Sequence, residues 1–535
     1  MRLGPKLTGL FAALAFGPVA AFCLADALFP VPLTRAQQLA TVVEDRIGQP
    51  LRVFPSSDGM WRLPARAADV PAHFRLMLTN YEDKRFDRHP GVDPIALARA
   101  TAQAVWHGRI VSGGSTLTMQ TARLLEPRPK GLSAKFLQMF RAVQLERRFS
   151  KDEILGLYLT LAPYGGNIEG VESAARLWFG KSARQLDVAE AALLVALPQS
   201  PTALRPDRHG DAARAARDKA LRRAAHLLPP GVAAEAMTEP VPSLRAALPF
   251  LAPHLAESLA RRARGQTIRT TLDADLQAAL EALARRQLLD LAPKANLAIV
   301  VVENQSRRVL AQLGGVDYFD DQRAGRVDLA SAYRSPGSTL KPFIYGMGFD
   351  DAIVHPQTII DDAPTRFGDY APANFDRRWH GEITAAQALQ NSLNIPAVAV
   401  LDRVGPMRFA AALGQGGVRM RLPRAETRPG LAIGLGGSSL RLVDLVSLYA
   451  SLGDDGAVEP LIDLAGRGRE GGFPLLSKHS ATIVLDILRG AATPDGFAPA
   501  EVTQAERRIA VKTGTSFGFR DAWAIGVSAS HSVGV

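Results

Sequence analysis

Cysteine is almost missing from this chain. Cys23 is the only cysteine among 535 residues, so no disulfide can form within the chain even in an oxidising compartment. The sequence also lacks internal repeats and low-complexity tracts. Its length leaves ample material for two or three domains with buried cores.

Charge is missing from one long stretch, residues 7–25, which Arg2 and Lys6 precede. An uncharged run of this length can span a bilayer, and its basic flank keeps the N-terminus in the cytoplasm. A cleaved signal peptide is the competing interpretation, because Ala25-Asp-Ala27 is similar to a small-x-small cleavage site, but the apolar run is longer than that of most signal peptides. We therefore expect residues 1–30 to form a cytoplasmic tail and an uncleaved membrane anchor.

Acidic residues are fewer than basic ones. The 52 Asp and Glu residues face 63 Lys and Arg residues, which gives a net charge of +11. A basic surface suits nucleic acid, anionic lipid or a pyrophosphate substrate. The expected membrane anchor favours the last two, so we expect no nucleic-acid partner.

The pattern of the sequence changes along the chain. Ala, Leu and Arg recur at helical spacing in the first half, and we expect a mainly helical domain over residues 50–228. The proline-rich residues 229–267 predict a linker. In residues 268–535, β-branched segments such as Leu297–Glu303 alternate with helices, which predicts an α/β domain whose helices pack on an antiparallel sheet.

Three short motifs follow one another in the second domain: Ser338-Thr-Leu-Lys341, Ser392-Leu-Asn394 and Lys512-Thr513-Gly514. A lysine three residues after a serine lies on the same face of a helix, where it can take the serine's proton and activate the hydroxyl as a nucleophile. Each motif alone is more simply explained as a helix cap, a helix end or a turn. Together, in this order, they predict an activated serine with a proton relay and a carboxylate-binding strand.

A second group of polar residues lies in the helical domain. Glu82 and Asp83 form a carboxylate pair, an arrangement that can tune one of them as a general base. The turn Gly113-Gly-Ser115-Thr116 offers backbone and hydroxyl donors, and Arg123 and Lys135 can hold a phosphate. Alone, such a carboxylate pair usually lies on a solvated helix face, and such a turn has no function beyond changing the chain direction. The order of these residues along the chain, taken together, therefore supports the prediction of a site.

The order of these motifs resembles a known family. Residues of about 60–205, including Ala162–Asn167, resemble a family-51 peptidoglycan glycosyltransferase, and residues of about 268–535 resemble a penicillin-binding transpeptidase. Together they are similar to a class A penicillin-binding protein, and Ser335–Phe343, Lys512–Trp523 and Ala162–Asn167 are most similar to its 1C branch. The resemblance implies a single-pass protein of the bacterial inner membrane, with a mainly α, lysozyme-like first domain and both catalytic domains in the periplasm.

For the first domain, the resemblance implies that Glu82 is the general base that deprotonates the 4-hydroxyl of lipid II. That oxygen would attack the anomeric carbon of the lipid-linked growing glycan strand, with inversion, and expel undecaprenyl pyrophosphate. The implied substrate-binding residues are Asp83, Ser115, Thr116, Gln120, Arg123 and Lys135. No cofactor is required and no protein metal site is expected, although a divalent cation, Mg²⁺ or Mn²⁺, could assist the reaction.

For the second domain, the resemblance implies that Ser338 attacks the penultimate D-alanine carbonyl of a stem peptide, with Lys341 as base and Ser392 as proton relay. The implied substrate-binding residues are Asn394, Lys512, Thr513, Gly514 and Thr515. Penicillin and other β-lactams would be trapped on Ser338. The expected partners are lipid II, the growing glycan strand, the membrane and other proteins of cell-wall synthesis.

Three features depart from the family pattern. Gln138 stands where many members have a glutamate three residues after the equivalent of Lys135, so Glu82 would act without a second carboxylate. Thr160 stands where many members have asparagine. The chain stops at Ser532–Val535, a strand expected to continue beside the Lys512 strand, so we expect a transpeptidase domain that is incomplete at its C-terminus and exposes a sheet edge.

Two other functions would use the same residues. A β-lactamase or a D-alanyl-D-alanine carboxypeptidase also acylates a serine, but no Glu-x-x-x-Asn of the class A β-lactamase type lies between Asn394 and Lys512. A penicillin-binding scaffold with one or both sites idle is the non-catalytic alternative. The intact Glu82, Ser338 and Lys341 favour an enzyme.

Overall fold

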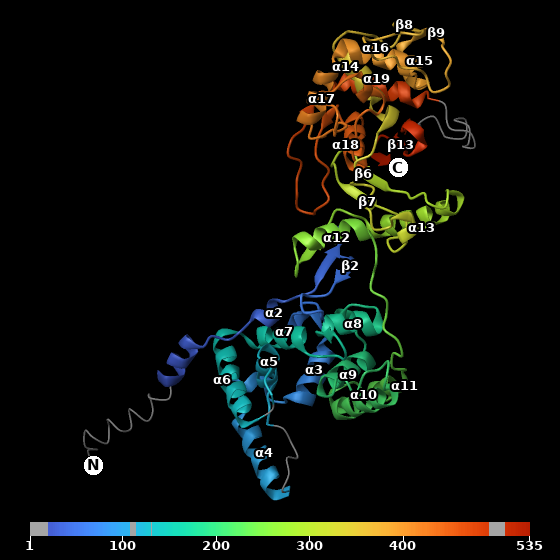
Figure 1. Cartoon of the computed structure of the whole chain (residues 1–535). Helices are drawn as coiled ribbons and strands as arrows, with labels where there is room; N and C mark the ends of the chain where they lie inside the picture. Colours follow the sequence, from blue (N-terminus) through green and yellow to red (C-terminus); the bar gives the residue numbers. More distant parts are fainter. Residues whose placement is uncertain (1–19, 108–113, 130, 492–508) are drawn as a thin grey trace. The chain divides into compact units, whose positions relative to one another are not determined.

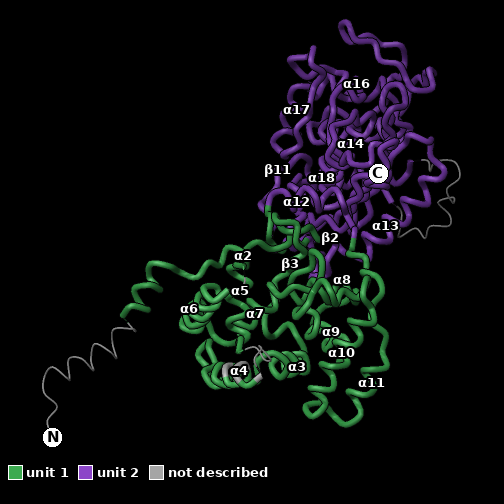
Figure 2. The backbone as a smooth tube through the Cα atoms, turned by 60° about the horizontal axis from the view of Figure 1, so that its bottom comes forward, with its two compact units in different colours: residues 1–42, 53–249, 263–267 green, residues 43–52, 250–262, 268–535 purple. Residues whose placement is uncertain are grey.

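The protein is described by a computed structural model that covers residues 20–107, 114–129, 131–491 and 509–535. The chain divides into two compact units, coloured separately in Figure 2. The first unit holds residues 1–42, 53–249 and 263–267, and the second holds residues 43–52, 250–262 and 268–535.

Two segments were expected to lie outside the catalytic domains, the membrane anchor and the linker. Of the predicted anchor, residues 7–25, only 20–25 are described, in a helical segment that extends to residue 28. No helix within the described ranges is long and apolar enough to cross a membrane. The predicted linker, residues 229–267, contains helices α11 (Val232–Thr238) and α12 (Pro253–Arg262), because its prolines lie at a helix start and in the connecting turns.

Helices make up most of the first unit (Figure 1). Its longer elements are α3 (Ala72–Glu82), α4 (Pro94–His107), α5 (Leu117–Leu125), α6 (Leu132–Arg148), α7 (Lys151–Leu161), α8 (Val171–Phe179), α9 (Val188–Ala196) and α10 (Gly210–Ala224). Capping boxes start α7 and α9, where a side chain before the helix and a glutamate three residues later satisfy free backbone N–H groups. Helices α3, α9 and α10 pack together, α5 packs against α6 and α7, and one large apolar core lies among them. The predicted helical first domain is confirmed.

An antiparallel five-stranded sheet is the centre of the second unit. Its strands are β6 (Ile299–Glu303), β7 (Val309–Leu313), β12 (Ala510–Thr515), β13 (Ala522–Val527) and β14 (His531–Gly534), in the order β12-β13-β14-β6-β7. Because side chains alternate along a strand, Ile299 and Val301 pack against α13 (Ala274–Gln287), while α18 (Leu442–Leu452) covers the other face of β6 and β14. This confirms the predicted sheet with helices packed on it.

The last strand lies in a different place from the one expected. Strand β14 does not border the Lys512 strand, because β13 pairs with β12 along all six residues and a tight turn then returns the chain on the far side of β13. There β14 is bonded on both sides, since His531–Gly534 also pairs with β6. Val533 and Val535 pack into the core beneath α13. The strand that carries Lys512 is therefore held by a full-length partner.

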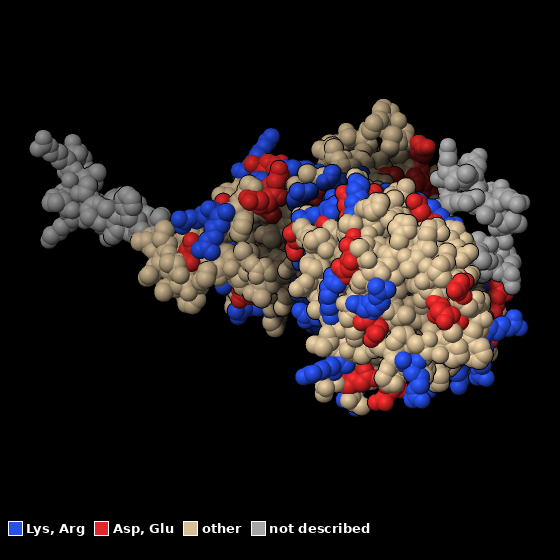
Figure 3. Space-filling model, turned by 90° about the horizontal axis from the view of Figure 1, so that it is seen from above, with Lys and Arg blue, Asp and Glu red and all other residues tan. Residues whose placement is uncertain are grey.

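Charges of both signs are interspersed on the surface shown in Figure 3, with wide uncharged areas between them. The excess of 11 positive charges is not gathered into one basic patch on that face. One of the arginines is wholly buried in the first unit. The Arg62 side chain is 0% exposed and its Nη2 lies 2.6 Å from Oε2 of Glu169, which is 6% exposed.

Breaking this buried ion pair should destabilise the first unit. Glu169→Leu removes the carboxylate that pairs with both Arg62 and Arg35, and it leaves the Arg62 guanidinium with Asp58 and backbone carbonyls. Breaking a buried ion pair by removing one partner costs about 3–5 kcal/mol. We expect the thermal transition of the first unit to move to lower temperature in differential scanning calorimetry. Arg66→Ala is the matched control, because Arg66 pairs with Asp69 on the surface, and it should leave the transition almost unchanged. Equal shifts in the two variants would contradict this assignment.

Candidate active sites

Ser338 lies in a short turn, Gly337–Leu340, that runs directly into α14 (Lys341–Asp350). The side chain is half-buried, and the turn is fixed from two sides. Trp523 donates its indole N–H to the carbonyl before the turn at 2.8 Å, and the Tyr449 hydroxyl donates to the Thr339 carbonyl at 2.6 Å. The serine is thus presented at the start of a helix, where free backbone N–H groups favour negative charge.

Two glycines let strand β12 pass directly against this turn. A Cβ atom on Gly337 would lie 2.6 Å from the Thr515 carbonyl oxygen and 2.7 Å from its nitrogen. A Cβ atom on Gly514 would lie 2.6 Å from the Pro336 carbonyl oxygen. Gly337 also has φ of +54°, a conformation that favours glycine. The structure therefore brings Gly514 and Thr515 beside Ser338, as the motif order predicts, and leaves the side chains of Thr513 and Thr515 exposed along β12.

Four polar residues drawn from the three motifs form one network, Lys341, Ser392, Asn394 and Lys512. Lys341, which is 0% exposed, places its Nζ 2.6 Å from the Ser392 carbonyl oxygen and 2.7 Å from Oδ1 of Asn394, the first residue of α16 (Asn394–Val404). The Ser392 hydroxyl accepts from Lys512 at 2.8 Å and lies 3.5 Å from the Lys341 amine. Ser392 has φ of +56°, an uncommon conformation for serine, in the turn between α15 (Ala385–Gln390) and α16. Two lysines thus meet at one hydroxyl group.

Burial lowers the pKa of both lysines. Desolvation holds the pKa of Lys341 well below its usual range, and the nearby charge of Lys512 lowers it further. Desolvation also lowers the pKa of Lys512, to about 8. A neutral Lys341 amine can accept a proton from a nearby hydroxyl, whereas Lys512 stays mostly charged below pH 8. This arrangement can activate a serine and attract a carboxylate at the same time.

In the first unit, Glu82 is the last residue of α3. Its half-buried carboxylate accepts one bond on each oxygen, from Gln120 Nε2 at 2.8 Å and from Gln199 Nε2 at 3.0 Å. The structure therefore brings Glu82 and Gln120 together as predicted. Two amides from separate segments fix the direction of the carboxylate, which suits a general base.

Asp83 and Thr116 are used in a different way from Glu82. The Asp83 carboxylate is buried, where one oxygen accepts from the Leu117 backbone N–H at 2.9 Å and lies 2.9 Å from His89 Nε2. Thr116 caps α5 by accepting from the Met119 N–H at 3.0 Å. Both side chains are engaged within the protein, so they fix the start of α5 and with it the position of Gln120.

The basic residues predicted to hold a phosphate lie on α5 and α6. Lys135 donates to the Ser115 hydroxyl, and its pKa is lowered by partial burial and by the charge of Arg123. Arg123 is exposed. Two cations that repel each other favour an anion between them, which fits a pyrophosphate.

Two residues of this site are not among the predicted ones. Gln199 ends Leu197-Pro-Gln199, a short segment after α9 that takes its place in the motif order but that sequence alone gives no role. Tyr158 on α7 is the second such residue, and no sequence motif points to it. Its hydroxyl is buried without a hydrogen-bond partner within the described chain. Burial raises the pKa of this phenol well above its usual range, and the charge of Glu82 adds to that effect. A protonated donor thus lies near the carboxylate.

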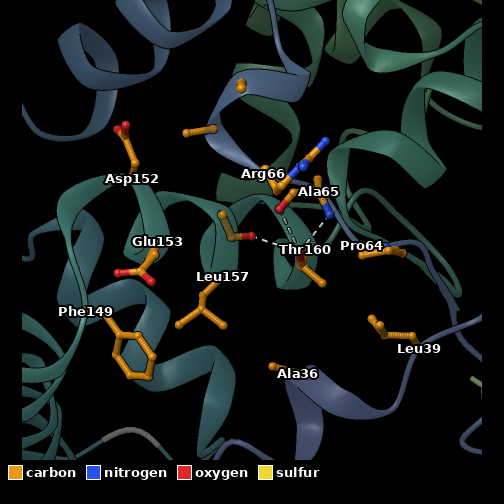
Figure 4. A pocket seen from close by; sticks show the side chains of 13 residues that line it. Ala36, Leu39, Pro64, Ala65, Arg66, Phe149, Asp152, Glu153, Leu157 and Thr160 are labelled. Carbon is orange, nitrogen blue, oxygen red and sulfur yellow. Dashed lines mark hydrogen bonds between the residues drawn. The ribbon is translucent and has the colours of Figure 1, made fainter. Parts of the chain in front are cut away.

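Thr160 lies in a pocket of about 470 Å³ between α7 and residues 64–68 (Figure 4). Its hydroxyl bonds the Gly156 carbonyl at 2.8 Å, and it accepts from the Ala65 N–H at 3.1 Å. Threonine at this position therefore ties two segments of the core together. Gln138 is half-buried on α6, one turn after Lys135.

Within the described ranges, no group of three His, Cys, Asp or Glu side chains is arranged to hold a metal ion.

The chain matches two family models: "Transglycosylase" over residues 48–225 and "Penicillin binding protein transpeptidase domain" over residues 297–528. It is 42% identical to penicillin-binding protein 1C of Escherichia coli over 98% of this chain and 68% of that protein. It is 30% identical to penicillin-binding protein 1B of Vibrio cholerae over 89% of this chain and 66% of that one. The chain thus spans about two thirds of the length of these curated relatives.

One solved structure supports the fold. The crystal structure of penicillin-binding protein 1A from Haemophilus influenzae matches with a TM-score of 0.53 at 17% identity, over 93% of this chain and 87% of that chain.

Adding one methyl group at Gly337 should disturb the contact between the turn and β12. Gly337→Ala forces the Thr515 backbone away, and a displacement of about 1 Å at a reacting group can cost about 100-fold in rate. We expect labelling of Ser338 by a fluorescent penicillin to slow by about that factor. Gly466→Ala is the control, because Gly466 also has a positive φ, +82°, but no atom within 4 Å of its Cβ position. Labelling that slows equally in both variants would show that the contact with β12 is not responsible.

Proposed function

Since the chain belongs to the class A penicillin-binding proteins, peptidoglycan synthases that join a transglycosylase domain to a transpeptidase domain, we propose that Glu82 and Ser338 carry its two reactions. The observation that carries the proposal is the hydrogen-bond network beside the Ser338 turn, in which Lys341 and Lys512 both donate to Ser392 and Lys341 also donates to Asn394. Such a site has what acyl transfer from a peptide with a terminal carboxylate requires.

The first reaction polymerises lipid II. Glu82 takes the proton of the acceptor 4-hydroxyl, the oxygen forms a bond to the anomeric carbon of the growing strand with inversion, and undecaprenyl pyrophosphate leaves. Gln120 and Gln199 keep the carboxylate pointed at the hydroxyl. Lys135 and Arg123 stabilise the charge that develops on the leaving pyrophosphate. Glu82 acts as the base with Gln138 in place of a second carboxylate.

The second reaction cross-links stem peptides. The neutral Lys341 amine takes the proton of Ser338, whose oxygen attacks the penultimate D-alanine carbonyl, and backbone N–H groups of Ser338 and Thr515 hold the oxyanion. Ser392, which accepts from Lys512, passes a proton to the departing D-alanine amine. The amine of a neighbouring peptide then displaces Ser338 from the acyl group. Penicillin reacts by the same first step and stays on Ser338.

The terminal carboxylate of the substrate binds along β12. The Lys512 ammonium and the exposed Thr513 hydroxyl supply its donors, and Asn394 borders the substrate from α16. The lipid substrate also accounts for the proposed membrane location. Residues 7–25 anchor the chain in the bacterial inner membrane, with both catalytic units on the periplasmic side. Any divalent cation would bind to the pyrophosphate of the substrate, and partner proteins of cell-wall synthesis would act at the same membrane.

A protein with only one working site is the alternative, either a penicillin-binding scaffold or a D-alanyl-D-alanine carboxypeptidase. Gln138 favours this alternative for the first site, because it removes a second carboxylate. The pairing of β12 with β13 favours a working second site.

Removing the charge of Glu82 should stop glycan synthesis. Glu82→Gln keeps the size of the side chain but cannot accept the proton, so we expect polymerisation of lipid II by the purified chain to fall at least about 100-fold. Gel analysis of the glycan products measures this. Glu126→Gln is the control, because Glu126 pairs with Arg128 and Arg141 in the same unit. Undiminished glycan from Glu82→Gln would show that another group is the base.

The rate of Ser338 acylation should depend on pH through both lysines. Lys341 must be neutral and Lys512 charged, so the rate should rise with pH through the lowered pKa of Lys341 and fall as Lys512 loses its proton near pH 8. Stopped-flow labelling with fluorescent penicillin measures the profile. Lys512→Arg should move the alkaline limb beyond pH 9, because arginine keeps its charge. Ser338→Ala should take no label, and a labelled Ser338→Ala chain would rule out this serine as the nucleophile.

A further inference from the structure

The segment between β8 (Ile359–Asp362) and β9 (Gly381–Thr384) reaches the transpeptidase site. Within this segment, the side-chain oxygen of Asn374 accepts from the backbone N–H of Asn394 at 2.8 Å. The first N–H groups of a helix have no partner inside the helix, and Leu393 before α16 offers no side-chain cap. Asn374 therefore caps α16 from a segment 20 residues away.

The neighbouring carbonyl fixes which way the Asn394 side chain points. Nδ2 of Asn394 donates to the Ala373 carbonyl at 2.7 Å. Because a carbonyl can only accept, the amide nitrogen must face Ala373, and the amide oxygen is left to face Lys341 at 2.7 Å. Residues 373 and 374 together hold both the backbone and the side chain of Asn394.

Asn374 is in turn held by a buried carboxylate. Its Nδ2 lies 2.9 Å and 2.7 Å from the two oxygens of Asp362, which is 0% exposed. Asp362 also accepts from the His380 backbone N–H at 3.0 Å and lies 2.9 Å from His380 Nδ1. Asn374 itself is 4% exposed. A continuous set of hydrogen bonds thus runs from His380 through Asp362, Asn374 and Asn394 to Lys341.

We propose that Asn374, anchored by Asp362, is a positioning residue for the acylation of Ser338, which it serves by holding Asn394 against Lys341. The inference rests on the proposed role of Lys341 as the base. A neutral lysine amine has two N–H donors and one lone pair. With its donors directed to the Ser392 carbonyl and to Asn394 Oδ1, the lone pair is left for the proton of Ser338. Without Asn374 the amide of Asn394 can turn, and the amine loses one of the two acceptors that orient it.

The test uses the full-length chain and fluorescent penicillin, with binding and acylation separated in stopped-flow measurements. Asn374→Ala should slow the acylation step by about 10- to 100-fold and leave the binding constant nearly unchanged. Loss of an acceptor also disfavours the ammonium form of Lys341, so the acid limb of the rate profile should move to lower pH. The other charged group that faces this amine, Lys512 of β12, is unchanged in the variant.

A pair of substitutions tests the contact itself. Asn374→Asp places a second carboxylate against Asp362 and should also slow acylation. Combining Asn374→Asp with Asp362→Asn exchanges donor and acceptor, keeps the total charge and still offers an oxygen to the Asn394 N–H. We expect the double variant to recover at least about tenfold of the lost rate relative to Asn374→Asp, which a merely structural loss would not show.

Asn304→Ala is the matched control. Asn304 is a buried asparagine with both ends of its amide bonded, to Ser528 and Ser532, away from the motifs. It should change stability but not the position of the acid limb. If Asn374→Ala acylates at the wild-type rate and pH profile, or shifts no more than Asn304→Ala, the positioning role is wrong. A wild-type chain that takes no label at all would instead overturn the proposed function.

Discussion

The second active site depends on one buried amine. Lys341 is fully enclosed, and a polar group in such a place must be hydrogen-bonded to partners within the protein. Its acceptors come from the turn before α16 and from α16 itself, and Lys512 arrives from the sheet to share Ser392. Because three segments far apart in the sequence must meet at this amine, the sheet, the turn and the helix are all held in register by the same small network.

In the first unit, too, distant segments hold one ionisable group, here the carboxylate of Glu82. Glu82 ends α3, where the helix no longer fixes its side chain, and two amides from distant segments do so instead. Asp83 next to it is buried and bonded to the start of α5, which carries Gln120. The two neighbouring carboxylates thus differ in their surroundings: Glu82, the proposed base, is half-buried between two amides, and Asp83 is buried and holds the helix that carries Gln120.

The sequence predicts the elements of this protein well and its contacts less well. The β-branched run of Leu297–Glu303 predicted the strand found at Ile299–Glu303, and the spacing of Ser338 and Lys341 predicted their place at the start of a helix, since these signals are local. Sequence did not place β14, because pairing order is set by hairpin geometry rather than by composition. It also missed Gln199, Tyr158 and Asn374, whose roles arise only when distant segments meet.

The two lysines of the transpeptidase site cannot exchange roles. Both amines are buried, and a positive charge on one disfavours a positive charge on the other. When only one of them is protonated, it is therefore the amine that is less completely desolvated. Lys512 on strand β12 is 4% exposed, and its pKa is about 8. Lys341 has no exposed surface, and its pKa is held well below its usual range. Near neutral pH the charge therefore resides on Lys512, to which we assign the substrate carboxylate, and the lone pair on Lys341, to which we assign the Ser338 proton. Because both groups are lysines, the depth of burial decides which of them is suited to act as a base.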